Sequence, residues 1–548
     1  MKKSVELRTI DDEFHHRGRV SLMESKVASD FDCDRYELAR AGKKQVLKRR
    51  FGLVSMTGLS CGLMCTWESL LVVLSMGFQN GGPAGLIYGF IIVWLGNLSV
   101  FIAIGELSSA IPTAGGQYHW VSVLAPKHSK RFFSYMTGWL TVIGWTAALT
   151  SVSFFVADLT LSLIELNIDG FQRTGWHATL LLWASLALCV FINVFVSSAL
   201  PSIEVIVLII HILGFFGILI SVIYLTPHHN SAEMVFSTFN NGGGWNSMTL
   251  AFFIGLQGNA LCFAGTDSPV HMAEEVKNAS TDVARSMLFS LIINGTLAFG
   301  MLLAVLFSTK DIGKMEGNLM VGIFYATVNS YAGATVMTSI IIILEFCSAM
   351  GCLAAASRMT WSFARDRGLP MARYISMIEK RTTIPVVAII VVTTLSALLA
   401  LIAIGSNVAF NGTISLVLEG FYVSYFLALG LLLWRRIRGD IRIESNHSAP
   451  MTFCSSPTLE IMEQDLYWGP WRLKGALGVA NNAIACCYLL LLIFFSFWPV
   501  SLDVKRGESM NWAVLVTGGV ALFSTGYYMI WARKSYNGPI VEIDLHTL

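Results

Sequence analysis

Charged residues are scarce in this sequence. They make up 13% of its 548 residues, about half of the roughly 25% that is usual in soluble domains. Hydrophobic residues make up 54% of the chain, and the mean hydropathy is +0.63. The net charge of +2 favours neither a nucleic acid nor an acidic protein as a partner. The composition therefore excludes an ordinary soluble domain and indicates a membrane protein.

Sequence signals for catalysis, metal binding and disulfide bonding are also missing. No pair of the ten cysteines has zinc-ribbon spacing, and most of them fall in or beside apolar runs, where a thiol acts as a small hydrophobe. The sequence has no HExxH motif, no nucleophile elbow and no GxxxxGK[ST] loop. We therefore expect no catalytic residues, no metal and no cofactor, and neither an enzyme nor a pump driven by ATP bound to this chain.

Long apolar runs are what the sequence has in abundance. A helix needs about 20 predominantly apolar residues to cross a bilayer. Twelve such runs are found, at 52–78, 83–112, 132–163, 177–197, 202–226, 249–270, 286–308, 332–357, 384–404, 409–434, 475–499 and 511–532. We predict an all-α polytopic membrane protein with a twelve-helix core at 52–532, between tails at 1–51 and 533–548. The polar first tail has no signal-peptide pattern, so the first run is expected to act as the insertion signal.

Basic residues are distributed unequally between the predicted loops. With the N-terminus in the cytoplasm, the loops and tails on that side hold 32 of the 37 lysines and arginines, and the opposite side holds 5. Membrane proteins carry such an excess on their cytoplasmic side. Both termini are therefore predicted to be cytoplasmic, in the plasma membrane or alternatively the vacuolar membrane, and no basic residue is expected at mid-membrane depth.

Two of the predicted spans contain residues that interrupt helices. The first span has the small-residue run Gly58–Gly62, and the sixth has Phe263–Asp267 followed by Pro269. Glycine and proline weaken helices, and interrupted helices at matching places in two repeats point to the solute site of a transporter. The candidates for solute binding are Gly58, Ser60, Cys61, Gly62, Phe263, Ala264, Gly265, Thr266 and Asp267. The alternative for Gly58 and Gly62 is a face where two helices pack closely.

Acidic residues inside the spans are a second unusual feature. Glu68, Asp158, Glu345 and Glu419 fall within predicted spans, whereas Glu204 falls near a cytoplasmic interface. A carboxylate at mid-membrane depth costs about 2.5 to 3.5 kcal/mol on insertion scales. Because no lysine or arginine is predicted beside them, the deeper acids are expected to be protonated, as a proton-coupled carrier requires. A protonated acid that simply hydrogen-bonds between helices explains each of them equally well.

His211 is the only histidine well inside a predicted span. A histidine there can relay protons near neutral pH. The alternative is a neutral histidine bonded to a helix carbonyl. The candidates for proton coupling are Glu68, His211, Glu345 and Glu419.

Three loop motifs accompany the twelve spans. They are Phe263–Asp267 followed by Ala273-Glu274-Glu275, the loop Pro112–Tyr118, and Ser357-Arg358 followed by Ala364–Pro370. Together with the span count, they resemble the amino acid–polyamine–organocation (APC) superfamily. Further features, such as Gly81-Gly82-Pro83 and Gly469-Pro470, are similar to its fungal amino acid/choline subfamily, which includes GABA and choline permeases. The charged residues of these motifs are the candidates for a cytoplasmic gate: Glu274, Glu275, Arg358, Arg365 and Asp366.

The resemblance implies a LeuT-like fold, with two inverted five-helix repeats plus two helices, and alternating access driven by protons. The chain departs from the family pattern at Asn278-Ala279-Ser280, where a proline-containing turn is usual. Its fifth helix also has no lysine, so His211 or an acid would have to serve in coupling. We predict a proton-coupled symporter for an amino acid, a GABA-like amine or choline. The alternative is a nutrient sensor that binds such a solute with little flux, and the oligomeric state is left open.

Overall fold

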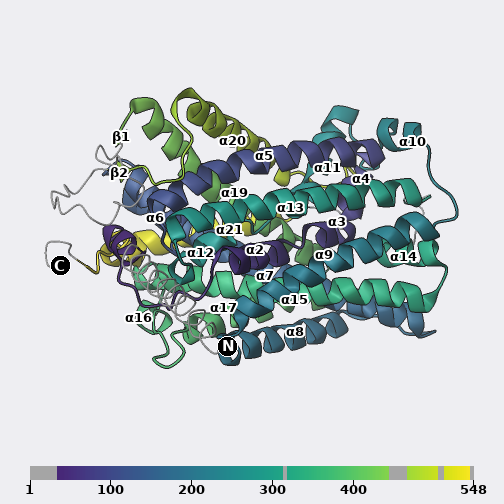
Figure 1. Ribbon diagram of the computed structural model, residues 1–548, viewed down its shortest axis with the longest axis horizontal. Helices are drawn as coiled ribbons and strands as arrows, with labels where there is room; N and C mark the ends of the chain where they lie inside the picture. Colours follow the sequence, from purple (N-terminus) through teal and green to yellow (C-terminus); the bar gives the residue numbers. More distant parts are fainter. Residues whose placement is uncertain are drawn as a thin grey trace, which may run out of the picture.

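The computed structural model describes residues 34–310, 312, 317–405, 407–442, 466–503 and 511–543, with the side chains of 407–411 excepted. It is a bundle of long helices that run side by side (Figure 1). Ten of the described helices are long and apolar enough to cross a membrane. Large hydrophobic side chains on their outer faces, such as Leu213, Phe195 and Leu522, are 66%, 74% and 78% exposed. Such faces suit contact with lipid, and the chain is a multi-pass integral membrane protein.

The uninterrupted spans follow the predicted apolar runs. They are α5 (Gly82–Ala110), α7 (Lys130–Asn167), α8 (Gly175–Phe195), α9 (Leu200–Leu225), α13 (Ala279–Ser308), α15 (Tyr331–Arg365), α17 (Val386–Ala400) with α18 (Ile402–Gly405), α19 (Asn407–Arg438), α20 (Gly475–Ser496), and α21 (Ala513–Tyr527) with η4 (Tyr528–Ala532) and α22 (Arg533–Ser535). With the two interrupted spans described below they complete the predicted twelve. Several helices, α7 and α15 above all, extend beyond the apolar run that predicted them.

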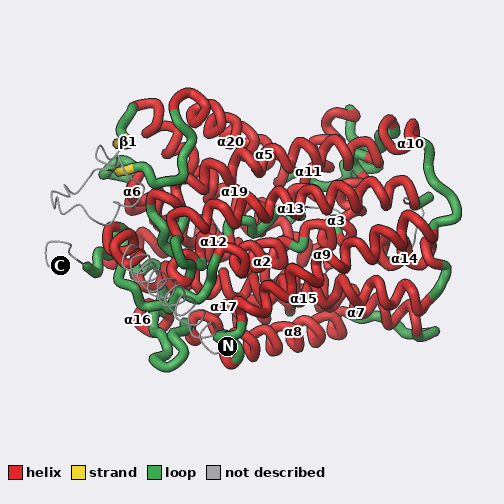
Figure 2. Tube along the Cα trace, in the orientation of Figure 1, coloured by secondary structure: helices red, strands yellow, loops and turns green. Residues whose placement is uncertain are grey.

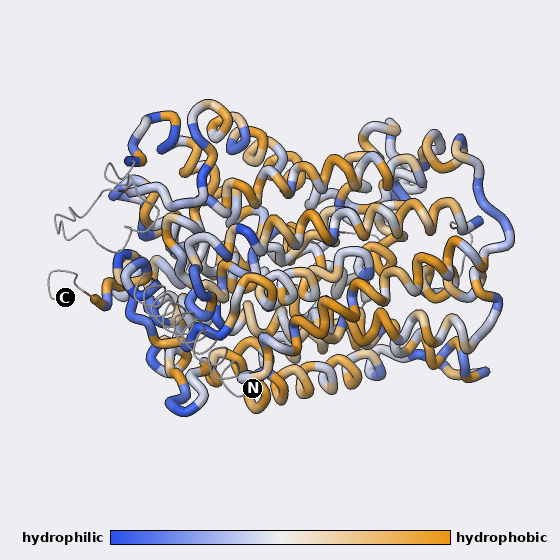
Figure 3. Tube along the Cα trace, viewed as in Figure 1, coloured by the Kyte–Doolittle hydropathy of each residue, from blue (hydrophilic) through white to orange (hydrophobic). Residues whose placement is uncertain are grey.

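Short elements cap the two ends of the bundle. The helices α10 (Ala232–Ser237) and α14 (Leu319–Val328) lie at one end. The opposite end has α6 (Gln117–Leu124), α16 (Ala372–Ile375) and the parallel pair of β1 (Ile441–Arg442) and β2 (Leu466–Tyr467), the only strands among the described residues (Figure 2). Hydrophobic residues follow the length of the helices, and hydrophilic residues gather toward these two ends (Figure 3).

The first span is broken into α2 (Leu53–Met64), α3 (Thr66–Val72) and α4 (Leu74–Gln79). The break between α2 and α3 falls at Cys65, whose φ of 41° and ψ of 50° are left-handed. A residue with a Cβ atom adopts this conformation at a cost of roughly 1 to 3 kcal/mol and only where its surroundings enforce it. The prediction of a break within Gly58–Gly62 is therefore wrong in position, because those residues belong to the continuous helix α2.

Gly58 and Gly62 instead allow α2 to pack closely on α9. A Cβ atom at Gly58 would lie 2.6 Å from the carbonyl oxygen of Glu204, and one at Gly62 would lie 2.7 Å from Cγ1 of Val207. The close-packing alternative thus accounts for both glycines.

The sixth span is broken where the sequence predicted it. Helix α11 (Met248–Leu261) ends before the segment Phe263–Asp267. The short helix α12 (Ser268–His271) and the 3₁₀ turn η1 (Ala273–Glu275) follow that segment. Gly265 has a φ of +84°, and a Cβ atom there would lie 2.6 Å from Cδ2 of Leu63. Pro269 stands in the first turn of α12, where its missing N–H removes no helical hydrogen bond.

The contact between α2 and α9 gives a test of this packing. We expect Gly58→Ala to destabilise the protein by about 1 to 3 kcal/mol, because its Cβ atom meets backbone that cannot rotate away. Gly217→Ala on α9 is the matched control, since nothing lies within 4 Å of a Cβ atom there. Thermal unfolding of the two variants in detergent measures the difference. Equal melting temperatures for wild type and Gly58→Ala would contradict the packing.

Candidate solute and coupling site

A buried hydrogen-bonded chain connects the break in the first span with α9 and α13. Nδ1 of His211 lies 2.7 Å from Oε1 of Glu68, and Nε2 of His211 lies 3.1 Å from Oδ1 of Asn294. The amide nitrogen of Asn294 donates to the carbonyl oxygen of Cys61 over 3.1 Å. Cys61 is in the last turn of α2, and the Glu68, His211 and Asn294 side chains are completely buried.

The donors and acceptors in this series of hydrogen bonds determine which atoms carry the protons. The carbonyl of Cys61 can only accept, so Nδ2 of Asn294 must donate to it, and Oδ1 of Asn294 then accepts from Nε2 of His211. With its Nε2 proton used in this way, His211 bonds to Glu68 through one further proton. That proton belongs either to Nδ1, as an imidazolium beside a carboxylate, or to Oε1, as a carboxylic acid beside a neutral imidazole. One proton is therefore shared by the pair.

The structure corrects two expectations about these intramembrane residues. His211 bonds to Glu68 and Asn294, whereas the alternative considered for it was a helix carbonyl. Asp158 was expected to lack a basic partner, but it forms an ion pair with Arg173 and accepts a hydrogen bond of 3.0 Å from Asn318.

A second carboxylate and histidine meet at the break in the sixth span. Oδ2 of Asp267 accepts from Nε2 of Gln117 over 2.7 Å and lies 3.1 Å from Nε2 of His271. Nδ1 of His271 lies 3.0 Å from the carbonyl oxygen of Ala114, which accepts its proton. The same reasoning places one shared proton between Asp267 and His271. His211 is therefore not the only histidine buried at a broken span, because His271 is also fully buried.

The two breaks touch each other. The hydroxyl of Thr266 lies 3.0 Å from Sδ of Met64 and donates to the carbonyl oxygen of Phe263 over 2.8 Å. Trp145 of α7 lies against Gly265, 3.5 Å from the position of a Cβ atom. Its ring lies 5.0 Å from that of Phe421 of α19. Aromatic side chains thus enclose the meeting point of the broken spans.

Several polar atoms around these breaks are buried and have no hydrogen-bond partner within the described residues. They are Oγ1 of Thr66, Nε1 of Trp67, Oε2 of Glu68, Nε1 of Trp145 and Oγ of Ser268. More than nine in ten buried polar groups in folded proteins are paired. A group of unpaired ones at two broken helices marks a place where a polar solute can supply the partners.

The other predicted binding and coupling residues differ in whether they lie beside the two breaks. Glu345 of α15 accepts a hydrogen bond of 3.1 Å from Ser69 of α3, next to Glu68. The Ser60 hydroxyl is hydrogen-bonded to the Ser290 hydroxyl, with 2.8 Å between the two oxygens. Glu419 accepts from Thr517 of α21, and none of its hydrogen bonds among the described residues joins it to His211.

All five predicted gate residues form ion pairs at the end of the bundle that carries α6 and α16. Arg365 makes two hydrogen bonds to Glu274, of 3.0 and 2.7 Å, and Nε of Arg358 lies 2.8 Å from Oε1 of Glu275. The fifth residue, Asp366, pairs with Lys43, and both side chains are wholly buried. Loss of one partner of a buried ion pair costs about 3 to 5 kcal/mol. These three pairs therefore tie together the elements at this end of the bundle.

The chain segments on either side of the core add to these contacts. Asp366 accepts from the Tyr118 hydroxyl over 2.8 Å and from the backbone nitrogen of Ile540 over 2.9 Å. Burial lowers the pKa of Lys43, and the Asp366 carboxylate opposes that shift. Phe51 and Val276 form an isolated parallel bridge, so the residues before α2 are tied to the turn after α12.

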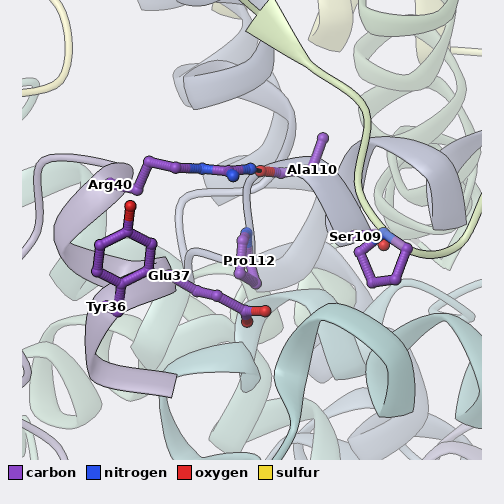
Figure 4. A pocket seen from close by; sticks show the side chains of 7 residues that line it. Tyr36, Glu37, Arg40, Ser109, Ala110 and Pro112 are labelled. Carbon is purple, nitrogen blue, oxygen red and sulfur yellow. Dashed lines mark hydrogen bonds between the residues drawn. The ribbon is translucent and has the colours of Figure 1, made fainter. Parts of the chain in front are cut away.

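Two hollows lie outside these contacts. The first is small and lies at the end with the ion pairs, where the helical residues 34–40 meet the end of α5 (Figure 4). Its wall includes Glu37, whose pKa is raised by burial and lowered in part by a hydrogen bond from Ser280. The second is lined by residues of α4, α11 and α19, with Asn80, Gln257 and Ser415 among its polar residues. It therefore approaches the breaks from the end opposite the gate pairs.

Two helices broken side by side around buried protonatable pairs, with one end tied together by ion pairs, define a membrane transporter. The family described as amino acid permease matches residues 51–520. The chain therefore belongs to the amino acid permease family of the APC superfamily.

Curated relatives agree with this assignment. A putative amino acid/polyamine transporter of Macrophomina phaseolina is 29% identical over 461 residues, which cover 83% of this chain and 96% of the relative. A choline transporter of Saccharomyces cerevisiae is 28% identical over 512 residues, covering 92% and 85%. The amino-acid permease BAT1 homolog of Oryza sativa subsp. japonica is 26% identical over 535 residues, covering 94% and 96%. These relatives are named as transporters and permeases, which are not enzymes.

Some residues of the site have no distinguishing signal in the sequence. Asn294 is one polar residue in an apolar run, and Trp145 is one of 15 tryptophans. Lys43 is one of several basic residues before the first span. His271 lies one residue beyond the predicted sixth span, although its spacing of four residues from Asp267 would place the two on one face of a helix.

Proposed function

We propose that this protein is a proton-coupled symporter for a small amine-bearing solute, an amino acid, a GABA-like amine or choline, with alternating access around the two broken spans. The observation that carries the proposal is the buried hydrogen bond between His211 and Glu68, which requires one proton between the two side chains. This pair contacts the break in the first span through Asn294 and Cys61. A change of its protonation thus changes the bonding of the backbone next to the solute site.

The proposed solute site is the meeting point of the two breaks. We propose Phe263–Asp267 as its wall in the sixth span, which are the residues that the sequence indicates. In the first span the site shifts from Gly58–Gly62 to Cys65–Glu68, because the glycines are used in packing. The unpaired Oε2 of Glu68 is suited to an ammonium group, and the faces of Trp145 and Trp67 are suited to a methylated one.

The three ion pairs are proposed to form the cytoplasmic gate. Two of them join η1, which follows the broken sixth span, to α15, and the third joins the residue after α15 to the segment before α2. An inward-facing state requires these elements to separate. The excess of basic residues at this end supports a cytoplasmic location for it, and we propose the plasma membrane as the site of transport.

Reconstituted protein tests the function. Proteoliposomes with an inward proton gradient are expected to accumulate at least one of tritiated choline, GABA or lysine, and a protonophore is expected to abolish the accumulation. His211→Gln and Glu68→Gln are each expected to reduce gradient-driven accumulation by about two orders of magnitude, as for loss of a proton-transfer group. His228→Gln is the matched control, because His228 is exposed outside the spans.

Accumulation by the wild type that ignores both the gradient and the protonophore would remove the coupling proposal. Saturable binding of a probe with no flux would instead support the sensor alternative.

The gate has a test of its own. Lys43→Gln leaves Asp366 buried without its cationic partner, so the closed state is expected to lose stability and the inward-facing state to become more populated. Labelling of Cys61 and Cys65, which are buried in the closed state, by a maleimide is expected to rise several-fold, as read by mass spectrometry of peptides. Lys44→Gln is the matched control, because the Lys44 side chain is exposed. Equal labelling in the two variants would show that Lys43 does not hold the gate.

A further inference from the structure

Glu204 is a buried acid that has no role in the mechanism proposed above. Its side chain lies in α9 and is only 1% exposed, and its Oε1 has no hydrogen-bond partner within the described residues. The sequence placed it near an interface, where a carboxylate costs little. The structure corrects this, because Glu204 is covered by α2. A carboxyl group buried without a hydrogen bond is strongly unfavourable when ionised.

The covering surface is the helix that ends at the break of the first span. A Cβ atom at Gly58 would lie 2.6 Å from the carbonyl oxygen of Glu204, and one at Gly62 would lie 3.8 Å from its Oε2. Glycines at both positions therefore let α2 lie directly over Glu204. Movement of α2 away from α9 therefore removes this part of the cover over the carboxyl group.

Glu204 shares a face of α9 with the coupling histidine. Seven residues separate Glu204 from His211, which is two helical turns or about 10 Å along the axis. Val207, one turn from each, also packs against α2. The two groups thus line the same seam between α2 and α9, with Glu204 on the side nearer the gate pairs.

The charges around Glu204 are few. The helices packed against α9 are α2, α13, α14 and α15, and no ion pair joins any of their described residues to Glu204. From α15 the Cys347 thiol interacts with it electrostatically. The only ionisable side chain of α2 is the thiol of Cys61, and Asn294 of α13 is neutral and bonded to His211. Within the part of the chain that the structure describes, no lysine or arginine forms an ion pair with Glu204.

We propose that Glu204 is the group that releases the coupled proton to the cytoplasm, a role that rests on the proposed symport. While α2 covers it, the carboxyl group keeps its proton. When α2 moves off α9, Glu204 gives that proton to cytoplasmic water and becomes a carboxylate. The His211–Glu68 pair then gives its shared proton, through water in the opened seam, to this carboxylate, which leaves His211 neutral, Glu68 ionised and Glu204 protonated. One proton enters the cytoplasm in each cycle.

The test separates solute exchange from proton movement. Glu204→Gln keeps the size and neutrality of the covered side chain but cannot carry a proton. In proteoliposomes loaded with a pH-sensitive dye, with the probe that the wild type accumulates, we expect this variant to retain solute counterflow. Its solute-driven proton flux and gradient-driven accumulation are expected to fall tenfold or more, roughly the lower range for loss of a proton-transfer group. Glu204→Asp is expected to recover part of the proton flux.

Controls keep the outcomes distinct. Glu165→Gln alters an exposed acid in the last turn of α7, and this variant is expected to behave as the wild type. Normal proton flux in Glu204→Gln would overturn the proposal, and so would loss of counterflow together with proton flux, since that result makes Glu204 a packing or solute-binding residue. Absence of proton flux in the wild type would instead overturn the symport on which the proposal rests.

Discussion

Every backbone group that a helix break releases inside a membrane must find a partner within the protein, because lipid supplies none. In the first span these partners come from two neighbouring helices, α13 and α15, and from the span itself. The carbonyl of Cys61 accepts from Asn294 of α13, that of Leu63 from Ser348 of α15, and the Cys65 thiol donates to the carbonyls of Gly62 and Leu344. The left-handed turn at Cys65 is stable because these contacts surround it.

The same need to pair backbone groups also assigns the protons of the coupling residues. Since Asn294 must donate to the Cys61 carbonyl, its other atom can only accept, and this assigns the proton on Nε2 of His211. Only one proton is then left between His211 and Glu68. In the mechanism proposed above, this structural requirement of the backbone acts as a protonation switch. The seam between α2 and α9 extends it toward Glu204 and toward the ion pairs of Glu274, Glu275 and Asp366.

The parts of the structure that local sequence determines were predictable. Span positions follow from the length of apolar helix that a bilayer requires, and the break in the sixth span follows from Gly265 and Pro269, which disfavour helix wherever they occur. The break at Cys65 was not predictable, because its partners come from distant segments. The pair of Glu68 and His211 is 143 residues apart in sequence, and that of Lys43 and Asp366 is 323 apart. Glu204 was misjudged because its distance from the membrane edge says nothing of the helix that covers it.

The central claim is that solute binding and the proton of the His211–Glu68 pair are thermodynamically linked. The most direct measurement is the equilibrium affinity of the purified protein for its solute between about pH 5 and pH 8. If the solute binds the pair together with its proton, affinity falls as the pH rises, by at most about tenfold per pH unit. His211→Gln should remove that dependence. A wild-type affinity that stays constant over this range, for a solute that does not itself titrate there, would contradict the account.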